Sequence, residues 1–244
     1  AAPCRVLYFS QNIGGPAHEA VAIGREVLAT LGRDSGAFAI EECTDCRQWS
    51  DAALAPYAAV VSYGYGTLPL TGANRRALVD FVRGGKGLVA LHAAVQLRVD
   101  PPWPEFAEMI GGVFVGQAWN QTVRLTVEDR LHPATRHLGA SLAFQDEIYQ
   151  FVPWDRAKTH VLLSVDPRSV DIFLPSLRRK DGDFAAAWCH PWGKGRVFYT
   201  TLGHYPAVWR APQFQAFLLG AVRWANGELP ARVPLGSDGR IVEF

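Results

Sequence analysis

Unbroken apolar runs alternate with amphipathic segments along the first hundred residues of this chain. Residues 58–63 (AAVVSY) and 88–91 (LVAL) are such runs, which are typical of strands covered on both faces. Residues 19–31 and 71–84 instead place apolar side chains at helical spacing. This alternation predicts a parallel sheet with right-handed crossovers. We therefore expect an α/β fold with strands at 5–10, 38–42, 58–63 and 88–91, and a first helix that ends at Gly32.

After residue 100 the pattern becomes richer in strands. A short helix from Glu105 should end at Gly111-Gly112. Extended character is expected at 121–128, 144–151 and 161–165, and the turn at 191–195 predicts a hairpin between 185–189 and 196–202. A helix over 213–224 follows. We expect a single domain over residues 1–244, with a core of about residues 4–227 and a C-terminal surface tail at 228–244.

The charge balance and hydropathy exclude two classes of partner. With 24 basic and 23 acidic residues, the formal net charge of +1 offers no positive field for nucleic acid. No apolar stretch reaches the roughly 18 residues that a bilayer span needs, so no membrane partner is expected. The start Ala1-Ala2-Pro3 is compatible with a cleaved signal peptide, so cytoplasmic and periplasmic or secreted locations both stay open.

The four cysteines do not make a disulfide scaffold, because a chain of 244 residues can stabilise itself with an apolar core. Cys43 and Cys46 have the CxxC spacing of redox and zinc sites. A zinc site would need a second ligand pair, and a redox motif would begin a helix after a strand. We expect structural or incidental cysteines, and the role of the pair is left open.

Three histidines stand where strands of the expected sheet end. His18 lies in the glycine-rich loop after the first strand, His92 follows LVAL, and His204 follows VFYTTLG. Ligands bind outside the carboxyl ends of strands in open parallel sheets, so these imidazoles should share one pocket. A lone histidine there is more often structural, but three together favour a site. The remaining histidines are expected to be structural or on the surface: His132, His137, His160 and His190.

The segment QDEIY adds acidic candidates to this pocket. In an extended strand Glu147 and Tyr149 share one face, while Asp146 points to the opposite face. Glu147 and Tyr149 could therefore serve one pocket. The alternative is a surface carboxylate beside a core tyrosine.

The loop that carries His18 also contains Gly14 and Gly15, which precede the first expected helix. Backbone N–H groups at such a place could hold an anion or a sugar oxygen of the substrate. No GxGxxG or Walker-type pattern accompanies them, so a nucleotide is not expected.

Neutral imidazoles together with a carboxylate suit zinc or a similar divalent ion. The candidate ligands are His18, His92, Glu147 and His204, which come from distant segments because the chain has no HxH or HExxH spacing. The same side chains could instead move protons without a metal. The sequence leaves both interpretations open.

Five motifs occur in order along the chain: GKGLVALHAA at 85–94, IGGVF at 110–114, HPAT at 132–135, DEIY at 146–149 and GKGRVFYTTLGH at 193–204. Together they resemble the ThuA-like family, named for trehalose utilisation. The resemblance covers nearly the whole chain. It implies a flavodoxin-like fold related to class I glutamine amidotransferases, an open and mostly parallel sheet with helices on both faces and added β-hairpin elements.

In that fold a cysteine nucleophile sits on the turn after a central strand. The corresponding turn of this chain carries His92. Because thiolate attack needs the sulfur at that place, glutaminase or protease chemistry is not expected. The four cysteines, Cys4, Cys43, Cys46 and Cys189, all lie elsewhere.

The resemblance also implies a protein of carbohydrate metabolism, a hydrolase or lyase acting on a 3-keto glycoside or a related sugar. A ketone acidifies the neighbouring C–H, so a general base could start the elimination of the aglycone. His92 or His204 would be that base, and a bound metal or His18 would stabilise the oxyanion. Glu147 with Tyr149 would bind the metal or protonate the leaving group.

The chain departs from the family pattern at three places. Pro16-Ala17-His18 stands where Phe-Arg-His is common, Val95-Gln96 stands where an acidic residue often follows His-Ala-Ala, and Gln117 stands where a histidine is common. These departures support an alternative, a noncatalytic carbohydrate-binding or assembly module on the same fold. A homo-oligomer is left open.

Aromatic and amide side chains complete the candidates for sugar binding. Gln117 and Trp119 are expected to contact the substrate. The indole ring of Trp119 would do so by stacking on a pyranose. Core packing is the competing explanation for most of the tryptophans in or near loops, which are Trp103, Trp119, Trp154, Trp192 and Trp209.

Overall fold

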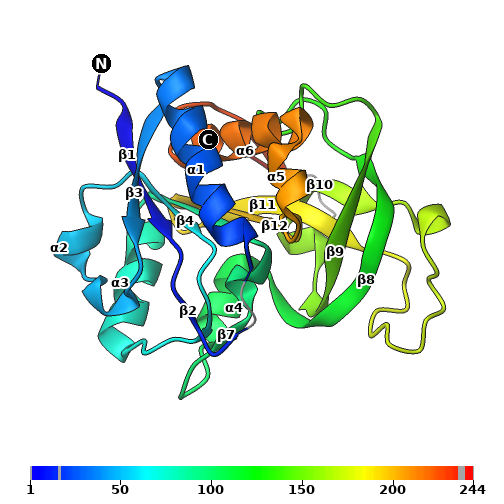
Figure 1. Ribbon diagram of the computed structural model, residues 1–244, viewed down its shortest axis with the longest axis horizontal. Coiled ribbons are helices and arrows are strands. Elements are labelled where there is room, and N and C mark those ends of the chain that lie inside the picture. The colour runs from blue at the N-terminus through cyan, green and yellow to red at the C-terminus, as the bar shows by residue number, and fades with distance from the viewer. Residues whose placement is uncertain (1, 16–17, 236–239, 244) are drawn as a thin grey trace.

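The computed structural model describes residues 2–15, 18–235 and 240–243. The signal-peptide prediction refers in part to Ala1, and one departure from the family pattern refers to Pro16-Ala17. These three residues lie outside the described residues. Within that part of the chain, one sheet of nine strands spans the protein in the order β3-β1-β4-β6-β12-β11-β10-β8-β9 (Figure 1). Its strands are β1 (Cys4–Phe9), β3 (Phe38–Cys43), β4 (Ala59–Ser62), β6 (Gly87–Leu91), β8 (Gly112–Val127), β9 (Ser141–Trp154), β10 (His160–Val165), β11 (Ala185–Trp192) and β12 (Gly195–Thr200).

The two halves of this sheet differ in strand direction. From β3 through β1, β4 and β6 to β12 the strands pair in parallel. From β12 through β11, β10 and β8 to β9 they pair antiparallel, and the long β8–β9 hairpin forms the far edge (Figure 1). The predicted α/β fold with a parallel sheet and added hairpins is confirmed.

Helices cover both faces of the sheet, so the central strands are buried on both sides (Figure 1). In β1, Val6 and Tyr8 pack into one core, whereas Leu7 and Phe9 pack into the other. This two-sided burial is the reason for the unbroken apolar runs in the sequence. The first core includes side chains of α1 (Ala20–Ser35), α5 (Pro206–Arg210) and α6 (Pro212–Ala225), and the second those of α2 (Asp51–Leu54), α3 (Gly72–Arg83) and α4 (Pro104–Ile110).

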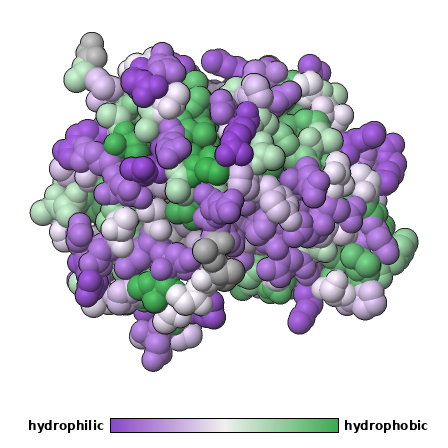
Figure 2. Space-filling view, viewed as in Figure 1, coloured by the Kyte–Doolittle hydropathy of each residue, from purple (hydrophilic) through white to green (hydrophobic). Residues whose placement is uncertain are grey.

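The outward faces of the helices are polar. Figure 2 shows a face covered mainly by hydrophilic residues, with apolar ones in smaller groups between them. None of the described helices combines the length and the apolarity needed to cross a membrane. Short 3-10 turns join the elements at η1 (Cys46–Gln48), η2 (His92–Val95), η3 (Arg156–Lys158) and η4 (Pro167–Ser169).

The predicted end of the first helix at Gly32 is wrong. Helix α1 continues to Ser35, and Gly36 ends it in the left-handed conformation with φ 68°. Gly32 instead permits close packing, because a Cβ there would lie 2.3 Å from the carbonyl oxygen of Phe38. The glycine therefore marks a helix–strand contact rather than a helix terminus.

A small second sheet extends the chain beyond three of the parallel strands. It pairs β5 (Tyr65–Thr67) in parallel with β2 (Asn12–Ile13) and β7 (Leu97–Arg98). These segments follow β1, β4 and β6, so they continue the edge where those strands end. They hold the loops of the candidate site, and the sequence analysis did not identify them.

The segment beyond Gly227, which the sequence analysis expects to be a surface tail, contains a pair of strands. Residues Arg232–Leu235 form β13, which pairs antiparallel with β14 (Arg240–Glu243). Val233 is fully buried and joins the first core. The alternation of the apolar, buried Val233 and Leu235 with the exposed Arg232 and Pro234 is the strand signal that this segment carries.

The pair Cys43 and Cys46 lies at the end of β3 and in η1, and both residues are buried with free thiols. Burial raises the pKa of the Cys46 thiol to about 11. A protonated, buried thiol suits packing rather than redox or metal chemistry.

His132 makes stability depend on pH. Its Nδ1 accepts a hydrogen bond from the backbone N–H of Ala134, which requires the neutral ring, and burial lowers its pKa to about 3. Since the unfolded ring titrates near pH 6.5, this contribution is complete above that pH and is lost as pH falls towards 3, by about 1.4 kcal/mol per pH unit. In urea unfolding at pH 7 to 4.5, His132→Asn should show a shallower loss of stability than the wild type. Equal slopes would contradict this prediction.

Candidate active site

His92 occupies a strained turn at the end of the central strand β6. Its φ of 44° is the one positive value recorded for a non-glycine residue in the described chain, and the strand changes there into the turn η2. The Nδ1 atom of His92 lies 2.6 Å from the carbonyl oxygen of Thr201, and Tyr199 donates a hydrogen bond to the His92 carbonyl. Because a carbonyl can only accept, Nδ1 carries a proton, and Nε2 is the ring atom that faces the rest of the cluster.

Three further polar groups lie within 3.4 Å of this Nε2 atom. The phenol oxygen of Tyr149 lies 2.8 Å away, Nδ1 of His204 3.1 Å away and Oε2 of Glu147 3.4 Å away. The ring of His18 lies 4.9 Å from that of His204, between centroids, and the ligand atoms of the three histidines all lie within 4.8 Å of one another. The sequence predicted these residues as candidates, and the structure brings all five together.

The surroundings set the charge of each group. Burial, followed by the charges of His92 and His204, lowers the pKa of His18 to about 4, and burial also lowers that of His204. Burial opposes ionisation of Glu147, but contact with His92 outweighs it and lowers the pKa of the carboxyl. Burial raises the pKa of Tyr149, which therefore keeps its proton. The cluster combines imidazoles, a carboxylate and a phenol donor.

The spacing of the donor atoms fits a divalent cation. Nε2 of His92, Nδ1 of His204 and Oε2 of Glu147 form a triangle with sides of 3.1, 3.4 and 3.5 Å. Ligands held about 2.0–2.1 Å from zinc lie roughly 2.8–3.4 Å apart in octahedral or tetrahedral geometry, slightly closer than these atoms lie without the ion. The hydrogen bond from His92 Nδ1 to a carbonyl also fixes the ring as it does in metal sites.

Asp146 supports this cluster from the opposite face of β9, and the sequence analysis missed its role. Its fully buried carboxylate accepts hydrogen bonds from the backbone N–H groups of Gly203, at 2.7 Å, and His204, at 3.0 Å. Burial raises its pKa to about 6. The available signal was its position between Phe144 and Ile148 on the core face, where a carboxylate needs donors.

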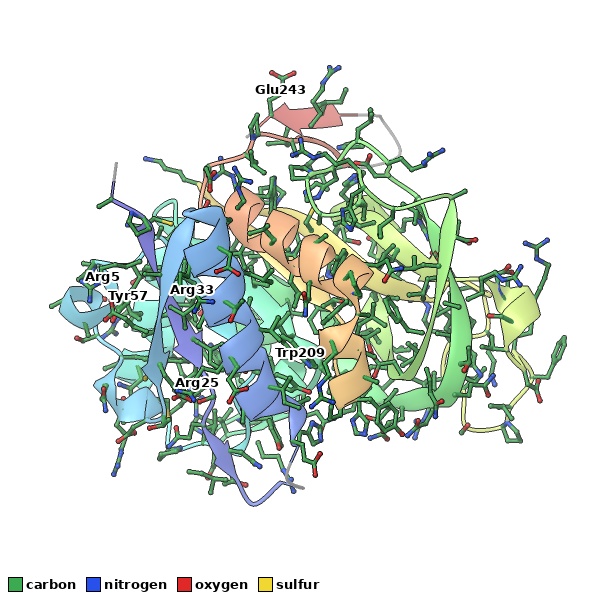
Figure 3. All side chains as sticks on the ribbon, turned by 45° about the horizontal axis from the view of Figure 1, so that its top comes forward. Arg5, Arg25, Arg33, Tyr57, Trp209 and Glu243 are labelled. Atoms are coloured by element: carbon green, nitrogen blue, oxygen red, sulfur yellow. The ribbon has the colours of Figure 1, made fainter. Side chains whose placement is uncertain are left out.

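Aromatic side chains that follow β4 form the next layer and were also missed. Tyr63 donates a hydrogen bond of 2.7 Å to the Gly203 carbonyl, and its oxygen lies 3.5 Å from Nδ1 of His18. Tyr65 accepts a hydrogen bond from the His18 backbone N–H. Trp209, labelled in Figure 3, donates to the same Gly203 carbonyl and stacks on Tyr63. The strand-end rule that identified the histidines applies equally to these tyrosines.

The substrate contacts of Gly14, Gly15 and Gln117 stay predictions, and the structure shows only where these residues lie. The Gly14 carbonyl accepts a hydrogen bond from Arg98, and Gly15 lies against Tyr65, where a Cβ would come within 2.8 Å of the ring. Gln117 lies on β8, is exposed, and pairs with Tyr149 on the neighbouring strand β9. These positions border the cluster without defining a contact.

The substrate contact expected for Trp119 is wrong. The side chain is 3% exposed, packs edge-on against Phe184, and donates its indole N–H to the Asp171 carbonyl. A ring enclosed in this way presents no face to a sugar. Trp154 and Trp209 are buried as well, so packing explains most of the tryptophans.

The fold retains a strained turn after the central strand but places an imidazole there. Cys189, on β11, is fully buried, and its sulfur lies 3.7 Å from Nε2 of His132, away from the His92 turn. Burial also raises its thiol pKa well above the ordinary value. The described thiols therefore do not support nucleophilic catalysis by cysteine.

A family model described as trehalose utilisation matches residues 5–225. The chain belongs to the ThuA family. The resemblance inferred from the sequence motifs is thereby confirmed. The sequence matches none of the curated proteins with which it was compared.

Solved structures of ThuA-like proteins share this fold. A ThuA-like protein from Bacteroides uniformis is 26% identical with a TM-score of 0.76, and the match covers 92% of each chain. Another, from Parabacteroides merdae, is 19% identical with a TM-score of 0.72 and covers 99% of this chain and 98% of that one. Such likeness supports the glutamine amidotransferase-like fold of the ThuA family.

Proposed function

We propose that this ThuA-family chain is an enzyme of carbohydrate metabolism, a hydrolase or lyase acting on a 3-keto glycoside or a related sugar. The observation that carries the proposal is the convergence of Tyr149, His204 and Glu147 on the Nε2 atom of His92. The family description supports a sugar as substrate. A ketone at C3 of the sugar makes the C–H bond at C2 acidic, and a cluster of bases and proton donors suits the removal of that proton.

His92, His204 and Glu147 would hold a divalent cation such as zinc. Two imidazoles and a carboxylate form a common catalytic ligand set, which leaves a position for substrate. When bound, the cation supplies Lewis-acid stabilisation of a developing oxyanion. With His92 and His204 as ligands, we assign the role of base to His18, whose ring nitrogen lies within 4.8 Å of those of the other two histidines.

The side chains of the cluster account for an elimination. His18 removes the proton from C2, beside the ketone at C3, and the electron pair of that C–H bond forms the C1–C2 double bond. The C1–O bond breaks, and the departing oxygen takes a proton from Tyr149, whose raised pKa keeps the phenol protonated. One proton is taken and one is given. Addition of water to the double bond completes hydrolysis, and without it the reaction is that of a lyase.

The test combines metal analysis with turnover of a 3-keto glucoside. Purified protein loaded with zinc and dialysed should retain about one ion per chain, because three protein ligands hold it. Glu147→Gln and His204→Ala should lose both metal and turnover. His18→Ala should retain the metal and lower kcat by about 10²-fold, since it removes only the base.

His160→Ala is the matched control. His160 forms an imidazole–carboxylate pair with Asp129 at 2.8 Å, outside the cluster, so the variant should keep metal and turnover. Undiminished turnover by metal-free protein would overturn the metal assignment. Tight sugar binding without any turnover would overturn the enzyme proposal and favour a noncatalytic carbohydrate-binding module.

A further inference from the structure

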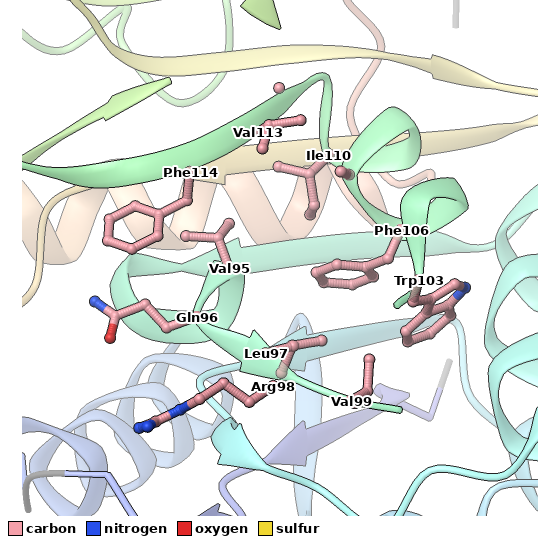
Figure 4. Close-up of a pocket in the computed structure, with 12 residues that line it drawn as sticks. Val95, Gln96, Leu97, Arg98, Val99, Trp103, Phe106, Ile110, Val113 and Phe114 are labelled. Atoms are coloured by element: carbon pink, nitrogen blue, oxygen red, sulfur yellow. The ribbon is translucent and has the colours of Figure 1, made fainter. Parts of the chain in front are cut away.

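A pocket of about 370 Å³ lies beside the histidine cluster (Figure 4). Its walls come from the segment after η2, from α4 and from the start of β8. Figure 4 shows Gln96 and Phe114 at one end of the pocket and Trp103 at the other. Neither the sequence motifs nor the proposed chemistry assigns a role to this space.

The end formed by Gln96 and Phe114 borders the cluster. The side-chain amide of Gln96 donates a hydrogen bond of 2.6 Å to the phenol oxygen of Tyr149. The ring of Phe114 lies 4.7 Å from that of Tyr149, between centroids. Tyr149 itself contacts His92, so this end of the pocket lies next to the cluster.

The opposite end is apolar. The rings of Trp103 and Phe106 lie 4.9 Å apart between centroids, and Leu97 and Val99 line the wall beside them. Side-chain hydrogen-bonding groups of the lining are confined to Gln96, Arg98 and the indole of Trp103. Hydroxyl groups buried there would lose their water without gaining enough partners.

Arg75 holds the loop of Trp103 in place. It is a buried side chain of α3, and its guanidinium donates hydrogen bonds to the carbonyls of Pro101, at 2.6 Å, and Asp100, at 3.1 Å. The guanidinium carbon also lies 5.9 Å from the centre of the Trp103 ring. The apolar end of the pocket is therefore built before a ligand arrives.

We propose that this pocket receives the leaving group of the substrate and selects an apolar aglycone, such as a phenyl ring, over a second sugar. The inference rests on the proposed function, since it places the reacting sugar at the histidine cluster. A flat ring can pack against the apolar wall that Trp103 and Phe106 form together, whereas a second hexose would bring its hydroxyl groups against Leu97 and Val99. The substrate class is therefore an aryl or similarly apolar glycoside rather than a disaccharide.

Calorimetric binding of phenyl glucoside, methyl glucoside and trehalose tests the selection independently of turnover. Phenyl glucoside should bind at least about tenfold more tightly than the other two, because only its leaving group is an apolar ring that the pocket can bury. Trp103→Ala should remove this preference without weakening methyl glucoside. Trp103→Leu, which keeps apolar volume, should retain part of the preference, and circular dichroism should show that both variants are folded.

Arg75→Met provides a second measurement, with Arg76→Met as its matched control. Both arginines lie on α3, but Arg76 is exposed. Loss of the Arg75 hydrogen bonds should reduce the phenyl preference, while Arg76→Met should leave it unchanged. If Arg75→Met and Arg76→Met change the phenyl preference equally, the proposed role of Arg75 in holding the Trp103 loop is overturned.

Two outcomes separate this inference from the proposed function. Trehalose binding as tightly as phenyl glucoside, with 3-keto glucosides still turned over, would overturn the aglycone inference alone. A phenyl preference that depends on Trp103, in a protein that turns over no 3-keto glucoside, would support the pocket and overturn the proposed chemistry.

Discussion

Replacing His92 by alanine should lower kcat/KM for a 3-keto glycoside by at least about 10³-fold. The reason is geometric, because Nε2 of His92 is the atom on which Tyr149, His204 and Glu147 converge. Its removal takes away a metal ligand and leaves the other groups without their common partner. Steady-state kinetics over a range of substrate concentrations would measure the loss.

The same substitution should leave the protein folded. It removes a buried ring together with its contacts to the Thr201 carbonyl, the Tyr149 hydroxyl and His204, so the free energy of unfolding should fall by roughly 2 kcal/mol. His137→Ala is the control, because His137 is exposed and its Nε2 atom lies 3.1 Å from the carbonyl oxygen of Gln213, outside the cluster. His137→Ala should match the wild type in both measurements, and full activity of His92→Ala would contradict the assignment of the site.

The parallel half of the fold and the place of the site could be predicted because both leave a strong local signal. Two-sided burial requires unbroken apolar strands such as residues 88–91, and the topology of parallel strands brings their carboxyl ends to one edge. His92, His18 and His204 follow from that rule alone. The shared face of Glu147 and Tyr149 follows from the two-residue period of a strand.

The remaining features depend on contacts between distant segments. Strands β2, β5 and β7 contain two or three residues each, which is too short for any periodicity. Gly32 is of the residue type that often ends a helix, but a glycine is required there because the helix packs closely against Phe38. Trp119 has the chemistry of a sugar platform, and only its contact with Phe184 shows that the ring is enclosed. Sequence gives the chemistry of such residues but not their neighbours.

Asp146→Asn should impair the site without touching the reacting sugar. Asp146 is a positioning residue, since its two carboxylate oxygens hold the backbone N–H groups of Gly203 and His204. An asparagine offers one oxygen and one NH₂ group, so one of the two N–H groups would face a second donor. A buried unpaired donor costs about 1–3 kcal/mol, and the His204 ring would lose its fixed position.

Three measurements distinguish this positioning role from a general loss of stability. At a temperature where the variant is fully folded, its zinc affinity should be about 10–100-fold weaker, as expected for a group that orients a ligand. Its kcat should fall with little change in KM, because the groups proposed to bind the aglycone are untouched. Asp34→Asn, which alters an exposed carboxylate at the end of α1, should leave all these values unchanged. If Asp146→Asn unfolds more easily yet binds zinc as tightly as the wild type, then the buried carboxylate serves stability alone, and the position of His204 is fixed by its other contacts with His92 and Glu147.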